Sequence, residues 1–393
     1  MPAHHRLSRF LLCLTVGVAN AAWAYPGWAY PGWAYPEYRV TVMGPANSIA
    51  TDINKYGVVT GDYYATSESP RGFLNRGAGI VYLGMPGSTS SNAVAVNDKG
   101  QVLGQWTTAA GQVRGFIYHV GTRRDIGAIP GRSTRYTDIN YGGYITAHGT
   151  KPDSFEGPRG FLRAPDGTFR DVGTLPYEEP HTYVFALNRS NQIAGASGPL
   201  TFPDQPLRAV LWAKGAMRDL GDFGWAPNYA EAINECGQLT GSMSVLGVFR
   251  DRIAFLYSNG RLINIDGRPA GGERYSAGAG INGLGHVVGS SDHLSGFVYR
   301  GRRMQSLNAL IDPALRWDIR SPKSINDAGQ IAATAHRNGV QYAVRLDLIR
   351  PILERAPELA PDHAAAPAAR ADEADAKANA QMQAREFVQP GQQ

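Results

Sequence analysis

Cysteine is almost absent from this chain, which has only two in 393 residues, Cys13 and Cys236. Two cysteines exclude a disulfide-dense scaffold and the paired CxxC motifs of a structural zinc site. Cys13 lies in an N-terminal segment that we expect to be removed, so we expect no intramolecular disulfide in the mature protein. Its stability must then come from packing.

Recognisable catalytic motifs are absent as well. The sequence has no Gly-x-Ser-x-Gly elbow, His-Glu-x-x-His, phosphate loop, EF-hand loop or sialidase-type aspartate box. Glu178 with His181, or Asp292 with His293, could form an acid/base pair, because that chemistry needs titratable groups within hydrogen-bond reach. Neither pair belongs to a recognisable catalytic motif. These absences favour a protein without catalytic activity, cofactor or metal, and they leave catalysis open.

Long apolar runs are missing except for one, from Phe10 to Ala22, which follows Arg6 and Arg9 and precedes a small-x-small pattern ending at Ala24. This pattern is typical of a secretory signal, and the run is too short to span a bilayer. We therefore expect a secreted or periplasmic protein with no transmembrane segment after cleavage. The expected divisions are a signal peptide (1–24), a Tyr/Pro/Gly/Trp-rich linker (25–37), a repeat domain (38–350) and a disordered or partly helical tail (351–393).

Charge is sparse, at 18% of residues, and the net charge is +5. The arginines recur once or twice in each repeat rather than in a cluster, which favours solubility over nucleic-acid binding. We expect no specific nucleic-acid partner, and a monomer. Non-specific association with anionic envelope polymers remains a third possibility, and it predicts an affinity that falls steeply with salt.

What the chain does contain is a repeat. An Asn recurs seven times in one context, at spacings of 43, 43, 48, 46, 48 and 44 residues. The period indicates a repeat protein. The seven marker residues are Asn54, Asn97, Asn140, Asn188, Asn234, Asn282 and Asn326.

Each marker predicts a type I turn. Asn is favoured at the first position because its side chain accepts a hydrogen bond from the backbone two residues on, and the fourth position favours a left-handed conformation. Six of the fourth positions are Gly, and the seventh is Asn191, the residue type that best tolerates positive φ after glycine. The markers are therefore interpreted as turn formers rather than ligand contacts.

Four short strands are predicted in each repeat, as the second copy illustrates with 93–97, 101–106, 114–118 and 123–127. In the third strand, a Gly or Ala always precedes Phe or Val, which indicates that a neighbouring sheet approaches one face closely. Arg114, Arg159 and Arg208 in third strands are expected to pair with Asp125, Asp171 and Asp219 in fourth strands.

The ends of the repeat region complement each other. The seventh copy lacks a fourth strand, whereas residues 38–44 look like a fourth strand with nothing before it. A ring closed in this way leaves no exposed sheet edge of the kind that a linear array would have. The predicted fold is an all-β, seven-bladed β-propeller of four-stranded antiparallel blades, with an N-terminal strand completing the last blade. A parallel β-helix needs only about half of this period per turn and does not explain the complementary ends.

The repeat unit resembles the extracellular HAF-repeat family. The copies Ala93 to Gly104 and Arg208 to Gly221 are similar to its pattern A-x-x-I-N-x-x-G-Q-V-V-G, then A-F-L-W, then D-L-G. The similarity covers about residues 38–348 and departs from the pattern at Ala147 and Ala333, in place of the second glycine. The resemblance implies export and a propeller-like repeat, and it implies no particular activity.

The long, variable loops join second to third strands and fourth to first strands, so we expect them on one face, called here the long-loop face. Variable loops on a rigid scaffold often bind ligands, and aromatic rings beside carboxylates suit sugars or peptides. We predict a binding or surface-interaction module for an extracellular protein or glycan; the alternative is a propeller hydrolase or lyase acting on extracellular polysaccharide. The candidate ligand-binding residues are Tyr64, Trp106, Tyr136, Glu156, Glu178, His181, Trp225, Tyr229, His293 and Trp317.

Overall fold

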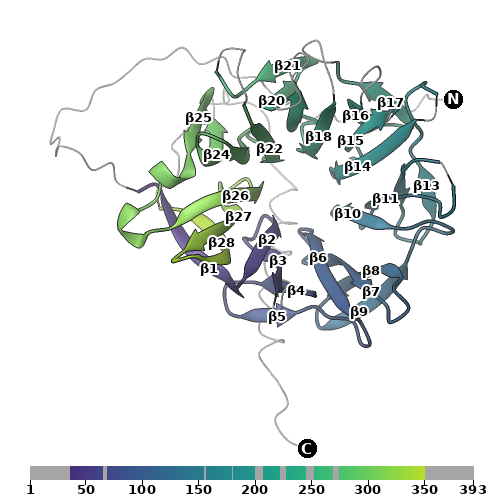
Figure 1. Ribbon diagram of the computed structural model, residues 1–393, viewed down its shortest axis with the longest axis horizontal. Helices are drawn as coiled ribbons and strands as arrows, with labels where there is room; N and C mark the ends of the chain where they lie inside the picture. The colour runs from purple at the N-terminus through teal and green to yellow at the C-terminus, as the bar shows by residue number, and fades with distance from the viewer. Residues whose placement is uncertain are drawn as a thin grey trace, which may run out of the picture.

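Seven four-stranded antiparallel sheets surround a central axis, as the predicted propeller requires (Figure 1). The computed structural model describes residues 36–64, 69–154, 156–178, 180–199, 207–221, 227–244, 252–268 and 274–349. The predicted signal peptide, nearly all of the predicted linker, the predicted tail and Trp225 lie outside these ranges. Blade 1 comprises β2 to β5, the following blades take four strands each, and blade 7 comprises β26, β27, β28 and β1.

The strands follow the predicted order within each blade. The innermost strands are β2 (Ser48–Ile53), β6 (Ser90–Val96), β10 (Arg135–Ile139), β14 (His181–Leu187), β18 (Asn228–Ile233), β22 (Ser276–Ile281) and β26 (Asp318–Ile325). The second strands are β3 (Val59–Tyr64), β7 (Val102–Thr107), β11 (Ile145–Gly149), β15 (Ile193–Gly198), β19 (Leu239–Ser244), β23 (Val287–Ser291) and β27 (Ile331–Arg337).

The outermost strand is the shortest of its blade in blades 1, 3, 4, 5 and 6. The third strands are β4 (Pro70–Asn75), β8 (Val113–His119), β12 (Arg159–Arg163), β16 (Arg208–Ala213), β20 (Arg252–Ser258), β24 (Ser295–Arg300) and β28 (Val340–Leu348). The outermost are β5 (Ile80–Tyr82), β9 (Thr122–Gly127), β13 (Phe169–Asp171), β17 (Ala216–Asp219), β21 (Arg261–Asn264), β25 (Arg303–Ser306) and β1 (Tyr38–Ala46). Two short 3₁₀ helices, η1 (Leu307–Ala309) and η2 (Pro313–Leu315), lie between blades 6 and 7 in sequence.

The predicted closure is confirmed. Strand β1 pairs with β28 in antiparallel register, from Tyr38 opposite Leu348 to Val42 opposite Val344. In Figure 1 the purple N-terminal strand lies beside the yellow-green C-terminal one. The hydroxyl of Thr41 donates a hydrogen bond of 2.9 Å to Asp347 across this pair. The sheet formed by the end of the chain is therefore completed by its beginning.

The small residue in each third strand lies where a neighbouring blade approaches. A Cβ added to Gly72 would lie 2.7 Å from the backbone nitrogen of Ala93 in the next blade, and one added to Gly160 would lie 2.7 Å from Val184. Ala209 and Ala254 occupy the equivalent site and are fully buried. The core accordingly consists of clusters between neighbouring blades, as the Gly and Ala register predicts.

The expected Arg–Asp pairs of the outer strands also form. Their N–O distances are 2.8 Å for Arg114 with Asp125, and 3.1 Å for both Arg159 with Asp171 and Arg208 with Asp219. These side chains are partly exposed, so each pair contributes about 1 kcal/mol or less.

Cys236 is the only cysteine among the described residues, and its backbone N–H donates to Asn234 Oδ1 at 3.0 Å within the turn that follows this marker.

Candidate functional site

The seven marker asparagines form a closed ring at one end of the central channel. Each Oδ1 accepts backbone hydrogen bonds within its own turn, as Asn97 does from Lys99 and Gln101 at 3.0 Å. Each Nδ2 donates to the backbone carbonyl of the marker in the next blade, over 2.8 to 3.1 Å, and the last step runs from Asn326 back to Asn54. The seven bonds link the turns into one closed ring, and the opening of the channel inside this ring is called the throat. We call this end the short-turn face.

Charged side chains join neighbouring turns at this throat. Arg189, which follows the marker of blade 4, donates to Asp98 of blade 2 at 2.5 Å and approaches Glu235 of blade 5 at 3.6 Å. Its guanidinium also lies over the ring of Tyr141 in blade 3, 5.1 Å from the centroid. Four consecutive blades are thus linked by one side chain.

Every innermost strand carries a register irregularity two to four residues before its marker. The innermost strands face the channel with an unpaired backbone edge, and bulges on such edges disfavour pairing with another chain. Beyond the bulge, Asp52 and Asp138 each accept backbone N–H groups from their own strand and from the next blade, at 2.7 to 2.9 Å. Each carboxyl therefore links its own blade to the next one through hydrogen bonds.

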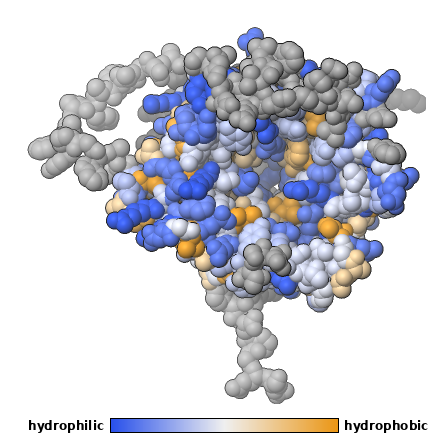
Figure 2. Space-filling view, in the orientation of Figure 1, coloured by the Kyte–Doolittle hydropathy of each residue, from blue (hydrophilic) through white to orange (hydrophobic). Residues whose placement is uncertain are grey.

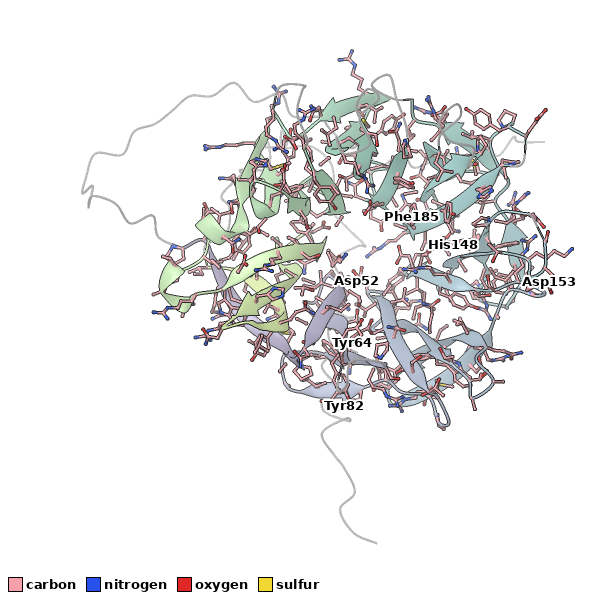
Figure 3. All side chains as sticks on the ribbon, viewed as in Figure 1. Asp52, Tyr64, Tyr82, His148, Asp153 and Phe185 are labelled. Atoms are coloured by element: carbon pink, nitrogen blue, oxygen red, sulfur yellow. The ribbon has the colours of Figure 1, made fainter. Side chains whose placement is uncertain are left out.

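Burial raises the pKa of both carboxyls. The pKa of Asp52 rises to about 6, and that of Asp138 to about 7, the latter helped by the charge of Asp52. Figure 3 places Asp52 beside the central opening. Because the two oxygens of each group already accept backbone hydrogen bonds, both carboxyls are interpreted as structural.

A row of aromatic rings lines the channel on blades 3 to 5, and we call it the aromatic wall: His148, Tyr183, Phe185 and Tyr229. Tyr183 and Phe185 are parallel neighbours on β14 with centroids 6.4 Å apart. Phe185 reaches Tyr229 of β18 at 6.4 Å, and His148 of β11 meets Tyr183 edge-on at 5.3 Å. Phe185 and His148 border the central opening in Figure 3, and Figure 2 shows apolar residues around the central hollow.

His148 supports this wall as a neutral residue. Its Nδ1 lies 3.2 Å from the carbonyl of Val184, and the residue is buried. Burial lowers its pKa to about 4. At neutral pH the imidazole is uncharged, so it packs against Tyr183 and needs no negatively charged partner. The ring therefore positions the wall rather than transferring protons.

A polar group flanks the aromatic wall on blade 5. The guanidinium of Arg252 lies over the ring of Tyr229, 5.4 Å from the centroid, and donates to Ser242 at 2.6 Å. Glu231 lies two residues beyond Tyr229 on β18, and burial raises its pKa against the opposing influence of Arg252 and Lys323. The arrangement offers aromatic faces, a guanidinium and a carboxyl within one part of the channel.

Of the candidate residues that lie within the described ranges, only Tyr229 belongs to the aromatic wall. Tyr136 was placed in an exposed loop, and that placement is wrong. It is the second residue of β10, is 1% exposed, and packs against Gly115 of the preceding blade. Its hydroxyl donates to the carbonyl of Gly127 at 3.2 Å. Tyr136 is thus part of the core between blades 2 and 3.

Three aromatic candidates lie at the ends of strands. Tyr64 ends β3, and desolvation raises its pKa. Trp106 is partly buried against the core between blades 1 and 2. Trp317, just before β26, packs edge-to-face with Tyr342 at 5.7 Å. Each is partly buried, and each belongs to a different part of the ring from the aromatic wall.

The polar candidates remain dispersed. Glu156 pairs with Arg132 at 2.8 Å, Glu178 is exposed, and His181 begins β14. His293 is exposed, 3.4 Å from Asp292, whose carboxylate is also engaged by Arg268. These residues come from different loops, and they form no common acid/base centre within the described ranges.

Sequence reasoning missed Tyr183, Phe185, His148, Glu231 and Arg252. All five are strand residues. Alternation along β14 marks Thr182 and Val184 as core and leaves Tyr183 and Phe185 on the other side, and this pattern was the available signal.

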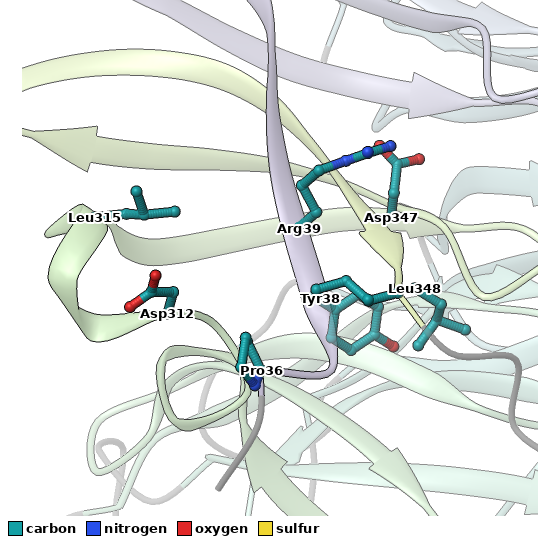
Figure 4. A pocket seen from close by; sticks show the side chains of 8 residues that line it. Pro36, Tyr38, Arg39, Asp312, Leu315, Asp347 and Leu348 are labelled. Carbon is teal, nitrogen blue, oxygen red and sulfur yellow. The ribbon is translucent and has the colours of Figure 1, made fainter. Parts of the chain in front are cut away.

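Two surface cavities lie on blade 7. One of about 470 Å³ borders the closing seam and is lined by Tyr38, Asp312, Leu315 and Leu348, among others (Figure 4). The other, of about 400 Å³, includes Trp317. In the part of the chain that the structure covers, no three His, Cys, Asp or Glu side chains are grouped to hold a metal ion. No helix in these ranges has the length and apolar character needed to cross a membrane.

Comparison with known proteins gives structural similarity only. No protein-family model matches the sequence, and no curated protein matches it. AofleA from Arthrobotrys oligospora is 12% identical, covering 71% of this chain and 91% of its own, with a TM-score of 0.40. TolB from Acinetobacter baumannii is 8% identical, covering 78% and 64%, with a TM-score of 0.41. A puromycin-hydrolyzing peptidase of Mycobacterium tuberculosis is 12% identical, covering 82% and 55%, with a TM-score of 0.47. We base no functional statement on these similarities.

Proposed function

We propose that this protein is an exported, non-catalytic binding module that engages an extracellular protein or glycan at the channel mouth on its long-loop face. The supporting observation is the aromatic wall, with Tyr183, Phe185 and Tyr229 on neighbouring inner strands beside Arg252 and Glu231. Aromatic faces cover apolar ligand surfaces, while the charged groups exchange hydrogen bonds with ligand hydroxyls or amides.

The direction of approach follows from the ring of asparagines. At the short-turn face, seven amide–carbonyl bonds tie the turns together and Arg189 bridges the turns of neighbouring blades. A ligand chain therefore enters from the long-loop face, where connections are longer and more varied. Lengths and contents of those loops would then tune specificity around a constant aromatic wall.

The test is a glycan array and a pull-down from extracellular material with the full chain, comparing wild type with the double variant Tyr183→Ala/Phe185→Ala. Tyr82→Ala is the control, because Tyr82 is an aromatic residue 48% exposed on outer strand β5. We expect the double variant to lose captured ligand and the control to retain it, with both variants keeping the wild-type melting transition. Equal capture by the double variant would refute the proposal.

The second candidate, a polysaccharide hydrolase or lyase, is favoured by one observation: burial raises the pKa of Glu231 near the channel mouth. A carboxyl that stays protonated at higher pH suits a general acid. Wild type and Glu231→Gln should be incubated with extracellular polysaccharides while new reducing ends and unsaturated products are measured. Turnover by wild type that is abolished in Glu231→Gln would establish the enzyme in place of the binding module.

A further inference from the structure

The smaller of the two cavities on blade 7 lies away from the aromatic wall. It measures about 400 Å³, within the range of small-molecule sites, and is lined by Val42, Trp317, Arg337, Asn338, Val340 and Tyr342. Val42 of the closing strand is 47% exposed there, an uncovered apolar surface. The segment before β26 and the β27–β28 hairpin, which form this cavity, both belong to the long-loop face.

Arg337 is held in one orientation by an aromatic stack. Its guanidinium lies 5.2 Å from the ring centroid of Trp317, and Trp317 is in turn fixed by the edge-to-face contact with Tyr342, at 85° between planes. A guanidinium stacked on an indole keeps its N–H fork free at the edges, where it matches a carboxylate in two parallel hydrogen bonds. The stack therefore preorganises an anion-binding group.

The fork has no protein carboxylate to bind. Among the described residues, no ion pair involves Arg337, which is exposed at the end of β27. Asp318, the carboxylate next to Trp317 in sequence, is engaged by Arg320 at 2.6 Å. Arg337 is also the one charged side chain that lines the cavity. The cavity thus combines one uncompensated positive charge with an apolar and aromatic lining.

We propose that this cavity binds the carboxylate-bearing sugar of an acidic polysaccharide, a uronic acid residue. The guanidinium of Arg337 binds the carboxylate, Asn338 supplies amide hydrogen bonds to hydroxyls, and Val42 with the Trp317 edge covers the apolar face of the pyranose. This site is independent of the aromatic wall and would stand if the wall bound nothing.

A sugar fits this cavity better than an acidic peptide. Peptides held in an extended conformation usually gain affinity by pairing with a free strand edge. Both edges of β28 are already occupied, by β27 on one side and β1 on the other, and the free outer edge of β1 is separated from Arg337 on β27 by β28. A sugar ring needs only a face and hydrogen-bonding groups, and these are present.

The experiment is isothermal titration of the full chain with an oligogalacturonate trimer and with its fully methyl-esterified form, which keeps the shape and removes the charge. We expect the acid to bind at least tenfold more tightly than the ester. Arg337→Gln should weaken the acid at least tenfold and leave the ester unchanged. Arg337→Lys should be intermediate, because it keeps the charge without the fork. Tyr82→Ala, at an exposed aromatic residue of the outer strand β5 that belongs to neither site, should bind the trimer as wild type does.

Several results would overturn this assignment. They are equal affinity for acid and ester, wild-type affinity in Arg337→Gln, or no binding of either trimer. A short oligoglutamate that binds as tightly as the trimer, with the same loss in Arg337→Gln, would identify an acidic-peptide site instead. Because Arg337 is exposed at a hairpin end, its substitution should leave the melting transition unchanged, and this is checked alongside.

Discussion

Replacing Asn97 by Asp tests one link of the asparagine ring, because it replaces the side-chain nitrogen by an oxygen and changes nothing else. Asn97 Oδ1 accepts from the backbone of Lys99 and Gln101, and Asp retains an oxygen there. Nδ2 donates to the carbonyl of Asn140 at 3.0 Å and to the side chain of Gln101 at 2.8 Å. The substitution removes only these two donations and places a carboxylate oxygen against two oxygens. The turn remains intact while the link to the next blade is broken.

The expected loss follows from those contacts. Two hydrogen bonds contribute about 1 kcal/mol each, and a buried carboxylate facing acceptors adds about 1 to 2 kcal/mol more. We expect the free energy of unfolding to fall by about 3 to 4 kcal/mol at pH 7. The loss should shrink in mild acid, because a protonated Asp regains one donor. Asn259→Asp, in the exposed β20–β21 turn, is the matched control and should change stability by about 0.5 kcal/mol or less.

The assay is urea denaturation at pH 7 and pH 4.5, with each variant compared with wild type at the same pH. An Asn97→Asp loss no larger than that of Asn259→Asp would refute the view that the ring stabilises the propeller. A loss of equal size at both pH values would show that the carboxylate charge is not its cause.

Further predictions concern pH, packing and the closing strand. Since burial raises the folded-state pKa of Asp52 to about 6 and of Asp138 to about 7, the folded state holds protons there that the unfolded chain releases, so these two carboxyls should lower stability as pH rises from about 4 to about 7, whereas His148, whose folded-state pKa is lowered to about 4, acts in the opposite direction. Asp138→Asn should flatten that fall by roughly 3 kcal/mol, measured by denaturation across this range, and an unchanged slope would contradict the assignment. Gly72→Ala should destabilise by about 2 kcal/mol or more because its Cβ would meet the backbone of the next blade, whereas Gly84→Ala, with open space around it, should be near neutral in thermal melts. Tyr38→Ala removes a buried ring at the seam and should lower stability by about 3 to 5 kcal/mol; a smaller change than that of the exposed Tyr82→Ala would argue against closure by β1.

The architecture was predictable because each copy of the repeat carries local signals. Asn at the turn start, with Gly or Asn191 at a position of φ between 58° and 79°, depends only on residues close in sequence. The complementary ends at Tyr38 and Leu346 required only a count of strands. The donation by each Asn Nδ2 to the next blade was not predictable, because it depends on how closely closure brings two turns together.

The binding surface was harder to infer for the same reason. Tyr136 was predicted in a long loop, yet it lies in β10, where Gly115 of the preceding blade leaves the space that its ring fills. Alternation along β14 separates Tyr183 and Phe185 from the core residues Thr182 and Val184, but only the position of β14 beside the channel shows what their side of the strand faces. Which strand of a blade is innermost, and which inner strands carry large aromatics next to each other, becomes visible only in three dimensions.

Hydrogen exchange of the full chain, with and without the captured ligand, tests the central claim most directly. The account predicts slowed exchange in residues 181–187 and 228–233, on the strands that carry the aromatic wall, and unchanged exchange in the seven asparagine turns. Protection confined to those turns or to the outer strands would contradict binding at the channel mouth.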